Sequence, residues 1–427
     1  MVVLFQRRFT PGEDDGAKLT IEELVRGRMV TSQFQPIVHL ETREVVGYEA
    51  FARGPAGTPF ETPTQMFAAA EAVGLTWELD LVAVAAAFTT AVNIGLPPEM
   101  SLFINVDPTT LGRPLPDDLA HALVAAHRRF KVFLEFSEHA LMVDPHSTVA
   151  SIDKARASGW GVSLDSIGVD TKALALMPFA RPDVAKIDVS LVHKDTHPNA
   201  AQVMNAVTAH AERTNASIMA VGIETEGHLR TARGLGAVLG QGYLFGAPGA
   251  LPTTSTSPTN PVRLIEPLPP PKFAETPFRL AAGADRALPA SEAVLTALAA
   301  HLERRVTADP DPIMFLACLP GNKLLSGAPL TALESVAAGA SYAGVLVRRP
   351  PHQRIAGVRL AAMAGDDPLQ DELSVILIGP HYAAMLVAQE RLPGRPAGGY
   401  EYRLLYDRVT VARAARVILH RIRAATA

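Results

Sequence analysis

Short apolar segments alternate with alanine-rich segments along the first 250 residues of the chain. The apolar segments are rich in β-branched and aromatic residues, which predicts strands, and the alanine-rich segments between them predict helices. The predicted strands are Phe34 to His39, Val45 to Phe51, Leu102 to Val106, Val132 to Glu135, Val162 to Asp165, Val184 to Asp188, Ile218 to Glu224 and Tyr243 to Phe245. Strands that are repeatedly separated by helices are expected to pair in parallel.

About eight such strands within about 230 residues predict a TIM-like (β/α)8 barrel, with an open doubly wound sheet as the alternative. The polar residues favour the barrel, because the carboxyl ends of all its strands open on one face. Six polar residues stand at or near such ends: Glu49, Asn105, Glu135, Asp165, Lys186 and Glu224. The intervals from Asn105 to Glu135 and from Glu135 to Asp165 are 30 residues each, about one strand-helix unit, so these residues return to the same rim.

Four of these residues form an all-oxygen donor set: Glu49, Asn105, Glu135 and Asp165. Three carboxylates and an amide suit a hard divalent cation such as Mg²⁺, Mn²⁺ or Ca²⁺ and suit zinc poorly. Lys186 could hold a phosphate, orient a water molecule or only neutralise a carboxylate. The structural alternative is that acidic residues at strand ends cap the following helices or pair with nearby arginines.

A change of composition between Pro248 and Phe273 predicts a linker. A flexible polar tract, Pro252-Thr-Thr-Ser-Thr-Ser-Pro258, precedes a stiff proline run from Pro267 to Pro271. We therefore predict an N-terminal tail over 1–17, a barrel over 18–250, a linker over 251–274 and a smaller α/β domain over 275–427.

Within the last segment, Ser291 to Arg305 predicts a capped amphipathic helix. Buried strands are predicted over Ile313 to Cys318, Ala343 to Val347 and Val375 to Ile378. His381 and Tyr382, which follow Gly379-Pro380, are expected to start a helix. The arginines near the end of the chain predict a solvated face: Arg403, Arg408, Arg413, Arg416, Arg421 and Arg423.

Composition and charge indicate a soluble cytoplasmic protein. The formal charge of −4 over 427 residues offers no broad attraction for nucleic acid or an anionic membrane, so no DNA or membrane partner is expected. Cys318 is the one cysteine, which fits a reducing compartment. The apolar start from Met1 to Phe5 is too short for a signal peptide, and polar residues within Leu79 to Leu96 suit a buried helix better than a membrane span.

An ordered series of motifs resembles the EAL domains, which are bacterial cyclic di-GMP phosphodiesterases. It begins with Phe34-Gln-Pro-Ile37 and Gly47-Tyr-Glu-Ala-Phe-Ala-Arg53, where Phe51 stands at the position of the family's signature leucine. The later matches are Pro63 with Phe67, Ala70-Glu-Ala-Val-Gly74, Leu79-Asp80, Phe103-Ile-Asn-Val106, Phe133-Leu-Glu-Phe-Ser-Glu138, Leu164-Asp165, Lys186-Ile-Asp188, Gly222-Ile-Glu-Thr225 and Gln241-Gly-Tyr-Leu-Phe-Gly246. The resemblance covers residues 18 to 250.

This resemblance implies a role for each matching residue. The ligands of one metal ion, Mg²⁺ or Mn²⁺ with Ca²⁺ as a further option, are Glu49, Asn105, Glu135 and Asp165. The supporting residues of the catalytic pocket are Lys186, Glu224 and Gln241. The residues that would meet the dinucleotide are Gln35, Arg53, Lys186, Asp188 and Gln241. Glu138 matches the carboxylate that anchors the loop after Asp165.

Two departures from the family's pattern affect hydrolysis. The family usually has two adjacent aspartates, and Ser166 stands in place of the second, so a second metal ion loses an anionic ligand. Val221 stands where the family has a carboxylate, and valine neither binds metal nor accepts a proton. Asp170 replaces a family glycine, which we expect to restrict the loop. Loss of a general base typically costs about 10²- to 10⁴-fold in rate.

The leading prediction is a degenerate EAL domain that binds cyclic di-GMP, or a related guanine dinucleotide, with little or no hydrolysis. The alternatives are an active phosphodiesterase that makes pGpG, with Glu224 as a substitute base, and an interaction scaffold that binds no nucleotide. Two C-terminal stretches, Leu377 to Met385 and Tyr402 to Arg408, resemble the DICT sensory domain, which implies signal input or a protein partner. EAL domains commonly dimerise, which leaves a homodimer open.

Overall fold

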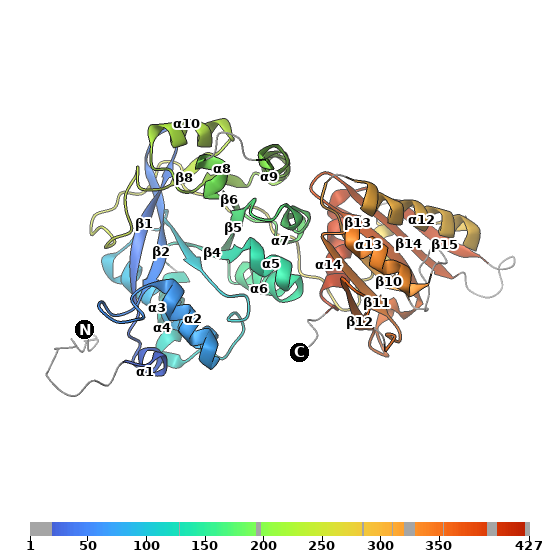
Figure 1. Cartoon of the computed structure of the whole chain (residues 1–427), viewed down its shortest axis with the longest axis horizontal. Helices are drawn as coiled ribbons and strands as arrows, with labels where there is room; N and C mark the ends of the chain where they lie inside the picture. Colours follow the sequence, from blue (N-terminus) through green and yellow to red (C-terminus); the bar gives the residue numbers. More distant parts are fainter. Residues whose placement is uncertain are drawn as a thin grey trace.

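The computed structural model describes residues 19–127, 129–193, 198–283, 286–309, 311–319, 329–352, 354–390 and 399–422, without the side chains of Asp118, Ala125 and His127. The predicted tail over 1–17 and Arg423 lie outside these residues. The described chain forms a closed barrel of eight strands with helices around it, followed by a domain built on a seven-stranded sheet (Figure 1). The predicted fold class, a barrel and then a second α/β domain, is confirmed.

The barrel strands follow one another in chain order around the barrel. They are β1 (Thr31–His39), β2 (Val45–Arg53), β3 (Ser101–Asn105), β4 (Lys131–Ser137), β5 (Gly161–Ile167), β6 (Val184–Ile187), β7 (Ser217–Ala220) and β8 (Leu239–Gln241). The strands β2 to β8 pair in parallel, but β1 is antiparallel to both β2 and β8. The expectation of parallel pairing throughout is wrong for β1, because the connection between His39 and Val45 is too short for a crossover helix.

The last strand of the barrel differs in position from the prediction. It covers Leu239–Gln241, which is buried, whereas Tyr243 in the predicted segment is 66% exposed. At Gly242 (φ +157°) a Cβ atom would lie 2.1 Å from the backbone oxygen of Ile223. Only glycine therefore allows the chain to pass so close to Ile223 directly after β8. The predicted strand over 218–224 is also too long, because β7 ends at Ala220, before Gly222 takes a positive φ of 73°.

Helices cover the outside of the barrel. They are α1 (Ile21–Arg26), α2 (Pro63–Val73), α3 (Thr76–Ile94), α4 (Asp117–His127), α5 (Glu138–Val143), α6 (Pro145–Ala157), α7 (Met177–Ala180), α8 (Val189–His193), α9 (Ala200–Thr214) and α10 (Glu226–Gly234), with a 3₁₀ helix η1 (Thr171–Ala175). By length and composition α3 alone among the described helices could cross a membrane, but half of its most apolar stretch is buried. Its buried residues pack in two core clusters, as the sequence predicts for a core helix.

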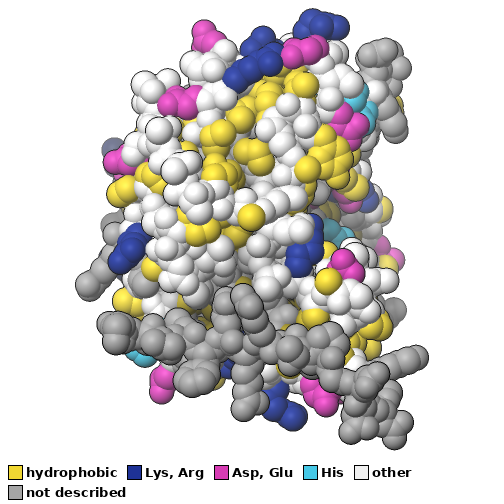
Figure 2. Space-filling view, turned by 90° about the vertical axis from the view of Figure 1, so that its left-hand side faces the viewer, with side chains coloured by type: hydrophobic (Ala, Val, Ile, Leu, Met, Phe, Trp, Pro, Cys, Tyr) yellow, Lys and Arg dark blue, Asp and Glu magenta, His cyan; other side chains and the backbone are white. Residues whose placement is uncertain are grey.

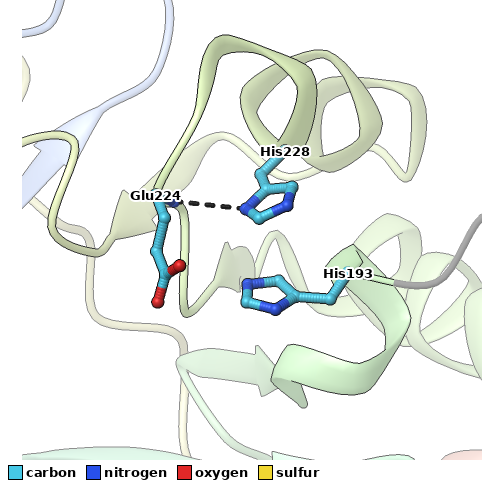
Figure 3. Close-up of side chains that lie close together, drawn as sticks. All are labelled: His193, Glu224 and His228. Carbon is cyan, nitrogen blue, oxygen red and sulfur yellow. Dashed lines mark hydrogen bonds between the residues drawn. The ribbon is translucent and has the colours of Figure 1, made fainter.

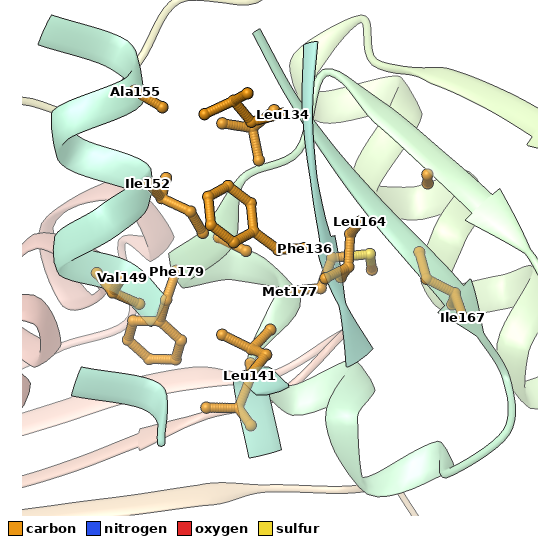
Figure 4. Close-up of a cluster of buried hydrophobic side chains, with 14 of the residues drawn as sticks. Leu134, Phe136, Leu141, Val149, Ile152, Ala155, Leu164, Ile167, Met177 and Phe179 are labelled. Carbon is orange, nitrogen blue, oxygen red and sulfur yellow. The ribbon is translucent and has the colours of Figure 1, made fainter. Parts of the chain in front are cut away.

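Two layers of apolar side chains hold the barrel together. The outer layer lies between the strands and the helices, where Phe136 and Leu164 meet Ile152, Met177 and Phe179 (Figure 4). The inner layer fills the barrel with residues that include Ile37, Val46, Phe103 and Phe133. The rings of Phe103 and Phe133 stack with their centroids 4.7 Å apart. The inner side chains close the barrel interior, which leaves its rim for polar residues.

The predicted linker is held against the barrel rather than free. Val262 is 3% exposed and belongs to the inner core cluster of the barrel. Its carbonyl accepts a hydrogen bond of 3.0 Å from Lys131 Nζ, and the amide of Ile265 donates to Asp183 Oδ1 over 2.6 Å. These contacts fix the part of the segment around residues 262 and 265, which lies between the polar tract and the proline run, on the barrel.

The C-terminal domain is a mixed sheet in the order β12-β11-β10-β13-β14-β15-β9. The strands are β9 (Leu288–Ala290), β10 (Met314–Leu319), β11 (Tyr342–Val347), β12 (Val358–Ala362), β13 (Glu372–Ile378), β14 (Ala383–Glu390) and β15 (Tyr400–Leu405). The helices are α11 (Pro277–Ala281), α12 (Glu292–Ala308), α13 (Leu333–Gly339) and α14 (Arg408–Leu419), with 3₁₀ helices η2 (Leu330–Ala332) and η3 (Pro368–Asp371).

The helices of this domain cover both faces of its sheet. Helices α12 and α13 lie on one face, and α14 lies on the other, between the sheet and the barrel (Figure 1). Cys318 is buried, as the sequence predicts for a small apolar side chain. His381 and Tyr382 lie in the turn between β13 and β14, so the predicted helix start is wrong. The Tyr382 ring stacks under the guanidinium of Arg305, 4.0 Å from the ring centroid.

Helix α14 docks the C-terminal domain on the barrel. Arg416, expected on a solvated face, is 2% exposed; it pairs with Asp153 of α6 and donates to the carbonyl of Phe179 over 2.9 Å. His420 Nε2 lies 3.1 Å from Asp153 Oδ2. One core cluster runs from the outer layer of the barrel through Val411 and Ala415 of α14 to Leu316 and Ile376 of the C-terminal sheet. The two domains therefore share a packed interface.

The surface carries charges of both signs. On the barrel face in Figure 2, basic and acidic side chains are interspersed among apolar ones. This face offers no broad field of one sign, in keeping with the formal charge of −4.

Candidate functional site

Three carboxylates from neighbouring strands surround one lysine at the carboxyl ends of the barrel strands. Lys186 Nζ lies 2.9 Å from Glu49 Oε2, 2.9 Å from Glu135 Oε1 and 3.4 Å from Asp165 Oδ1. Asn105 Nδ2 donates to Glu49 Oε1 over 3.0 Å. The strands β2 to β6 run parallel and adjacent, so residues far apart in the sequence reach one rim. The predicted donor set is thus brought together.

Burial and charge act against each other in this cluster. Burial alone would raise the pKa of Glu49, but the charge of Lys186 and hydrogen bonds from Lys186 and Gln241 hold it below its usual value. Burial and the neighbouring charge of Glu49 raise the pKa of Glu135 well above its usual value. Burial would lower the pKa of Lys186, but the surrounding carboxylates raise it. The negative charge of Glu49 thus disfavours ionisation of Glu135, whereas Lys186 favours ionisation of both carboxylates.

Two glutamines extend the cluster across β1 and β8. Gln241 Nε2 donates to Glu49 Oε2 over 2.8 Å and to Gln35 Oε1 over 3.1 Å. Gln35 Nε2 in turn donates to the carbonyl of Gly246 over 3.0 Å. In the antiparallel pairing of β1 with β8, Ile37 lies opposite Gln241. Gln35 stands two residues before Ile37 on β1, close enough for its side chain to reach Gln241. These bonds fix the orientation of Glu49, because both of its oxygens accept from amide groups.

The donor set fits a hard dication. When all three carboxylates are ionised, they exceed the lysine charge by two, which one divalent cation balances. Glu135 Oε1 is buried and, among the described residues, accepts no hydrogen bond, although Lys186 is near. A cavity of about 350 Å³ opens beside Asn105 and Glu135 and is also lined by Phe51 and Asp80. The site therefore offers oxygen ligands and an approach to them.

The loop after β5 turns at Ser166. Ser166 has a φ of +62°, a conformation that aspartate and asparagine adopt more readily than serine, and its hydroxyl donates to Asp165 Oδ2 over 3.2 Å. Glu138 accepts from the amides of Gly168 (2.9 Å) and Asp170 (2.8 Å), which is the geometry that a loop anchor requires. The expected restriction at Asp170 does not arise, because Asp170 has a φ of −122° and the positive φ falls on Gly168.

Val221 faces the inside of the barrel just after β7. Its side chain is partly buried and packs against the inner core cluster, which contains Met219 and Leu239. An apolar side chain therefore occupies the rim position that follows β7.

Three predicted residues lie outside the lysine cluster. Arg53 is half-buried, and its Nε donates to Gln33 Oε1 over 3.0 Å while Nη1 donates to the Ala52 carbonyl over 2.8 Å. Asp188 Oδ1 accepts from the amide of Ser190 over 2.9 Å, so it caps the start of α8. Glu224 is exposed and lies beside two histidines, His193 and His228 (Figure 3).

The sequence reasoning missed these two histidines. His193 and Glu224 are separated by 30 intervening residues, and α9 lies between them in the chain. The one local signal is the four-residue step from Glu224 to His228, which straddles the start of α10. It is too weak to identify a site without the fold.

The EAL domain family matches residues 20–248 of the chain. Curated relatives include the cyclic di-GMP phosphodiesterase NbdA of Pseudomonas aeruginosa, 27% identical over 234 residues, which cover 53% of this chain and 30% of NbdA. The cyclic di-GMP phosphodiesterase RocR of the same organism is 27% identical over 258 residues, or 57% of this chain and 64% of RocR. The chain thus spans less than two thirds of either relative.

Among solved structures, the Klebsiella pneumoniae BlrP1 complex with manganese and cy-diGMP at pH 9.0 is similar, with a TM-score of 0.46 and 26% identity over 52% of this chain and 57% of that one. The EAL domain of FimX from Pseudomonas aeruginosa bound to c-di-GMP has a TM-score of 0.48 and 18% identity, and the match covers 56% of this chain and 98% of that one.

Proposed function

Because this chain belongs to the EAL domain family, we propose that its barrel binds cyclic di-GMP, or a related guanine dinucleotide, together with one divalent cation and hydrolyses it little or not at all. The observation that carries the proposal is the contrast at the rim. The donor set of Glu49, Asn105, Glu135 and Asp165 is assembled around Lys186, whereas the positions after Asp165 and Ala220 hold Ser166 and Val221.

The assembled half of the rim supports binding. Glu49, Asn105, Glu135 and Asp165 would hold Mg²⁺ or Mn²⁺, with Ca²⁺ as the larger alternative, and such an ion supplies positive charge for a phosphate oxygen. Lys186 adds a buried ammonium beside the same position. Arg53, Gln35, Asp188 and Gln241 are proposed to contact the dinucleotide, and the planar guanidinium of Arg53 suits a phosphate.

The other half of the rim supports the loss of hydrolysis. Two-metal cleavage of a phosphodiester uses paired cations and a group that accepts the proton of the attacking water. The Ser166 hydroxyl is a neutral, weak ligand and already donates to Asp165. Val221 carries no proton acceptor and packs into the barrel interior. Loss of a base alone lowers the rate by about 10²- to 10⁴-fold, and loss of a second cation lowers it further.

The packed interface supports a signalling role for the C-terminal domain, which we propose to be of the DICT sensory type. The loop after Asp165 leads through η1 into α7, and the last turn of α7 meets Arg416 of α14 through the carbonyl of Phe179. A ligand that orders the loop after Asp165 would thereby affect the packing of α14 on the barrel. A protein partner would bind through the C-terminal domain, and a homodimer would form as in other EAL domains.

Calorimetry with the purified full chain tests this function. We expect cyclic di-GMP to bind in the presence of Mg²⁺ and to bind at least about tenfold more weakly in EDTA, because one positively charged phosphate contact is lost. Glu49→Ala should abolish the effect of Mg²⁺, whereas Glu41→Ala, a change at an exposed carboxylate between β1 and β2, should behave as the wild type.

Three outcomes distinguish the candidate functions. Absence of binding heat at high protein concentration ends the proposal and favours the interaction scaffold, whose partner would bind regardless of Glu49→Ala and Arg53→Ala. Binding followed by rapid release of pGpG, lost in Glu49→Ala, favours the active phosphodiesterase. Binding without turnover is the result expected here.

A further inference from the structure

A second group of metal-ligating side chains lies on the same rim, apart from the carboxylates around Lys186. His193 ends α8, which follows β6, while Glu224 and His228 lie at the start of α10, which follows β7. One potential ligand atom from each of the three residues lies within 4.8 Å of the others. Figure 3 shows the Glu224 carboxylate and the two imidazoles turned toward one common space.

The backbone orients the ring of His193. Its Nε2 lies 2.6 Å from the carbonyl oxygen of Gly222, and because a carbonyl can only accept, Nε2 carries the proton. In the neutral ring Nδ1 then holds a free lone pair. In Figure 3 Nε2 is the ring nitrogen of His193 that faces Glu224, and Nδ1 faces away from it. A metal ion between the three side chains would therefore meet Nε2 and replace its bond to the Gly222 carbonyl.

Glycine at position 222 makes this approach possible. Gly222 has a φ of +73°, and a Cβ atom there would lie 2.2 Å from Cγ2 of Val189 on α8. A larger residue would push α8 away and take His193 with it. The close packing of α8 on the loop before Glu224 is therefore built into the backbone.

His228 is held near Glu224 by a weak contact. The amide of Glu224 donates to His228 Nδ1 over 3.4 Å, at the long end of hydrogen-bond distances. The rings of His193 and His228 stack with their centroids 4.0 Å apart. Loss of one long contact is a small cost when either nitrogen of His228 coordinates a metal ion.

We propose that His193, Glu224 and His228 bind one late first-row transition-metal dication, with Zn²⁺ as the representative ion. Two imidazoles and one carboxylate are a ligand set that Zn²⁺ takes at open sites, with its fourth position left to water or another small ligand. Hard ions such as Mg²⁺ prefer the all-oxygen set around Glu49 instead. The two sites are thus selective for different metals, and the proposal does not depend on dinucleotide binding.

A Zn²⁺ titration of the full chain tests this site. The untagged protein is stripped with EDTA, transferred to metal-free buffer with excess Mg²⁺ to fill the oxygen site, and titrated by calorimetry. We expect one equivalent of Zn²⁺ to bind, and His193→Ala and His228→Gln each to weaken it by more than about tenfold, since even the loss of an outer hydrogen-bond partner costs about 10- to 100-fold. Substituted Co²⁺ should show visible absorption bands that disappear in Glu224→Gln.

Two control variants separate this site from other metal binding. His301→Ala removes an exposed histidine of α12, and Glu49→Gln alters the oxygen site; both should retain the Zn²⁺ equivalent. Circular dichroism verifies that each variant is folded, and His228→Gln and Glu224→Gln keep the size of the side chain. Absence of Zn²⁺ binding by the wild type, or binding that is unchanged in the His193 and His228 variants, overturns the proposal.

Discussion

Lys186 Nζ lies 2.9 Å from Glu49 Oε2, although the two residues are 137 positions apart in the chain. The same ammonium group contacts Glu135 and Asp165, so one buried positive charge stabilises three carboxylates. A dication bound at the rim would also stabilise these carboxylates. The stability of the barrel without metal should therefore depend on Lys186.

Replacement of Lys186 by methionine tests this dependence. Lys186→Met leaves Glu49 and Glu135 buried without their cation, so we expect the free energy of unfolding in EDTA to fall by about 3–5 kcal/mol. Mg²⁺ should restore part of the loss, because the dication takes over the charge. Urea unfolding with EDTA and with Mg²⁺ measures both effects. Lys172→Met, at an exposed lysine of η1, is the control. Equal stability of Lys186→Met and wild type in EDTA would contradict this account.

Asp80, which lines the cavity beside the donor set, predicts a pH dependence of stability. Burial raises the pKa of Asp80 to about 7, although its carboxylate accepts a hydrogen bond from the amide of Asp107. The unfolded chain has a lower value, so the folded state binds more protons between these pKa values. Stability from this group is present at low pH and is lost as the pH rises toward 7.

Asp80→Asn removes this titration. Asparagine keeps an acceptor for the amide of Asp107 and carries no charge, so the variant should gain stability over wild type as the pH rises from 4 to 8. The gain should reach up to about 4 kcal/mol, since one pKa unit corresponds to about 1.4 kcal/mol. Chemical unfolding at several pH values measures this gain, with Asp117→Asn, at an exposed residue of α4, as the comparison. A pH-independent difference would show that Asp80 does not titrate with folding.

The docking of α14 on the barrel depends on Arg416. Arg416→Met removes the guanidinium that pairs with Asp153, which is 12% exposed, and the bond to the Phe179 carbonyl, so we expect a loss of about 3 kcal/mol. Arg413→Met on the same helix breaks a pair with Glu275 that is 36% and 25% exposed, and should cost less than about 1 kcal/mol. Thermal unfolding and limited proteolysis within 251–274 compare the two variants. Similar effects of both changes would mean that the pair of Arg416 with Asp153 does not hold the two domains together.

Val262 should contribute to the stability of the barrel, although it lies in a segment with the composition of a linker. Val262→Ala removes buried methyl groups from the inner core of the barrel, and we expect a loss of about 2 kcal/mol. Leu264→Ala, two residues on and 46% exposed in the wild type, should cost clearly less. Unfolding by urea ranks the two variants. A larger loss for Leu264→Ala would mean that the segment does not close the barrel.

The barrel and its polar rim could be predicted from the sequence because both depend on local periodicity. Polar residues that end successive parallel strands must meet at one edge, and this rule predicts the group of Glu49, Asn105, Glu135 and Asp165. The direction of β1 can also be predicted from the sequence, because the five residues from Leu40 to Glu44 allow a hairpin but no crossover helix.

Other features arise from contacts that no local pattern encodes. The burial of Arg416 depends on the position of Asp153 in another domain. The anchoring of Val262 depends on the open end of the barrel interior. The group of His193, Glu224 and His228 forms because Gly222 lets α8 pack closely on the loop after β7. Such contacts form only in the tertiary fold, and the composition of each segment does not predict them.

The most direct measurement of the central claim is the release of pGpG from cyclic di-GMP, followed by chromatography, for the wild type and for the double variant Ser166→Asp with Val221→Glu. The variant restores a carboxylate at each altered rim position, and aspartate tolerates the positive φ at 166. We expect no product above background from the wild type with Mg²⁺ or Mn²⁺ and measurable product from the variant. Rapid, Glu49-dependent release of pGpG by the wild type would contradict the account.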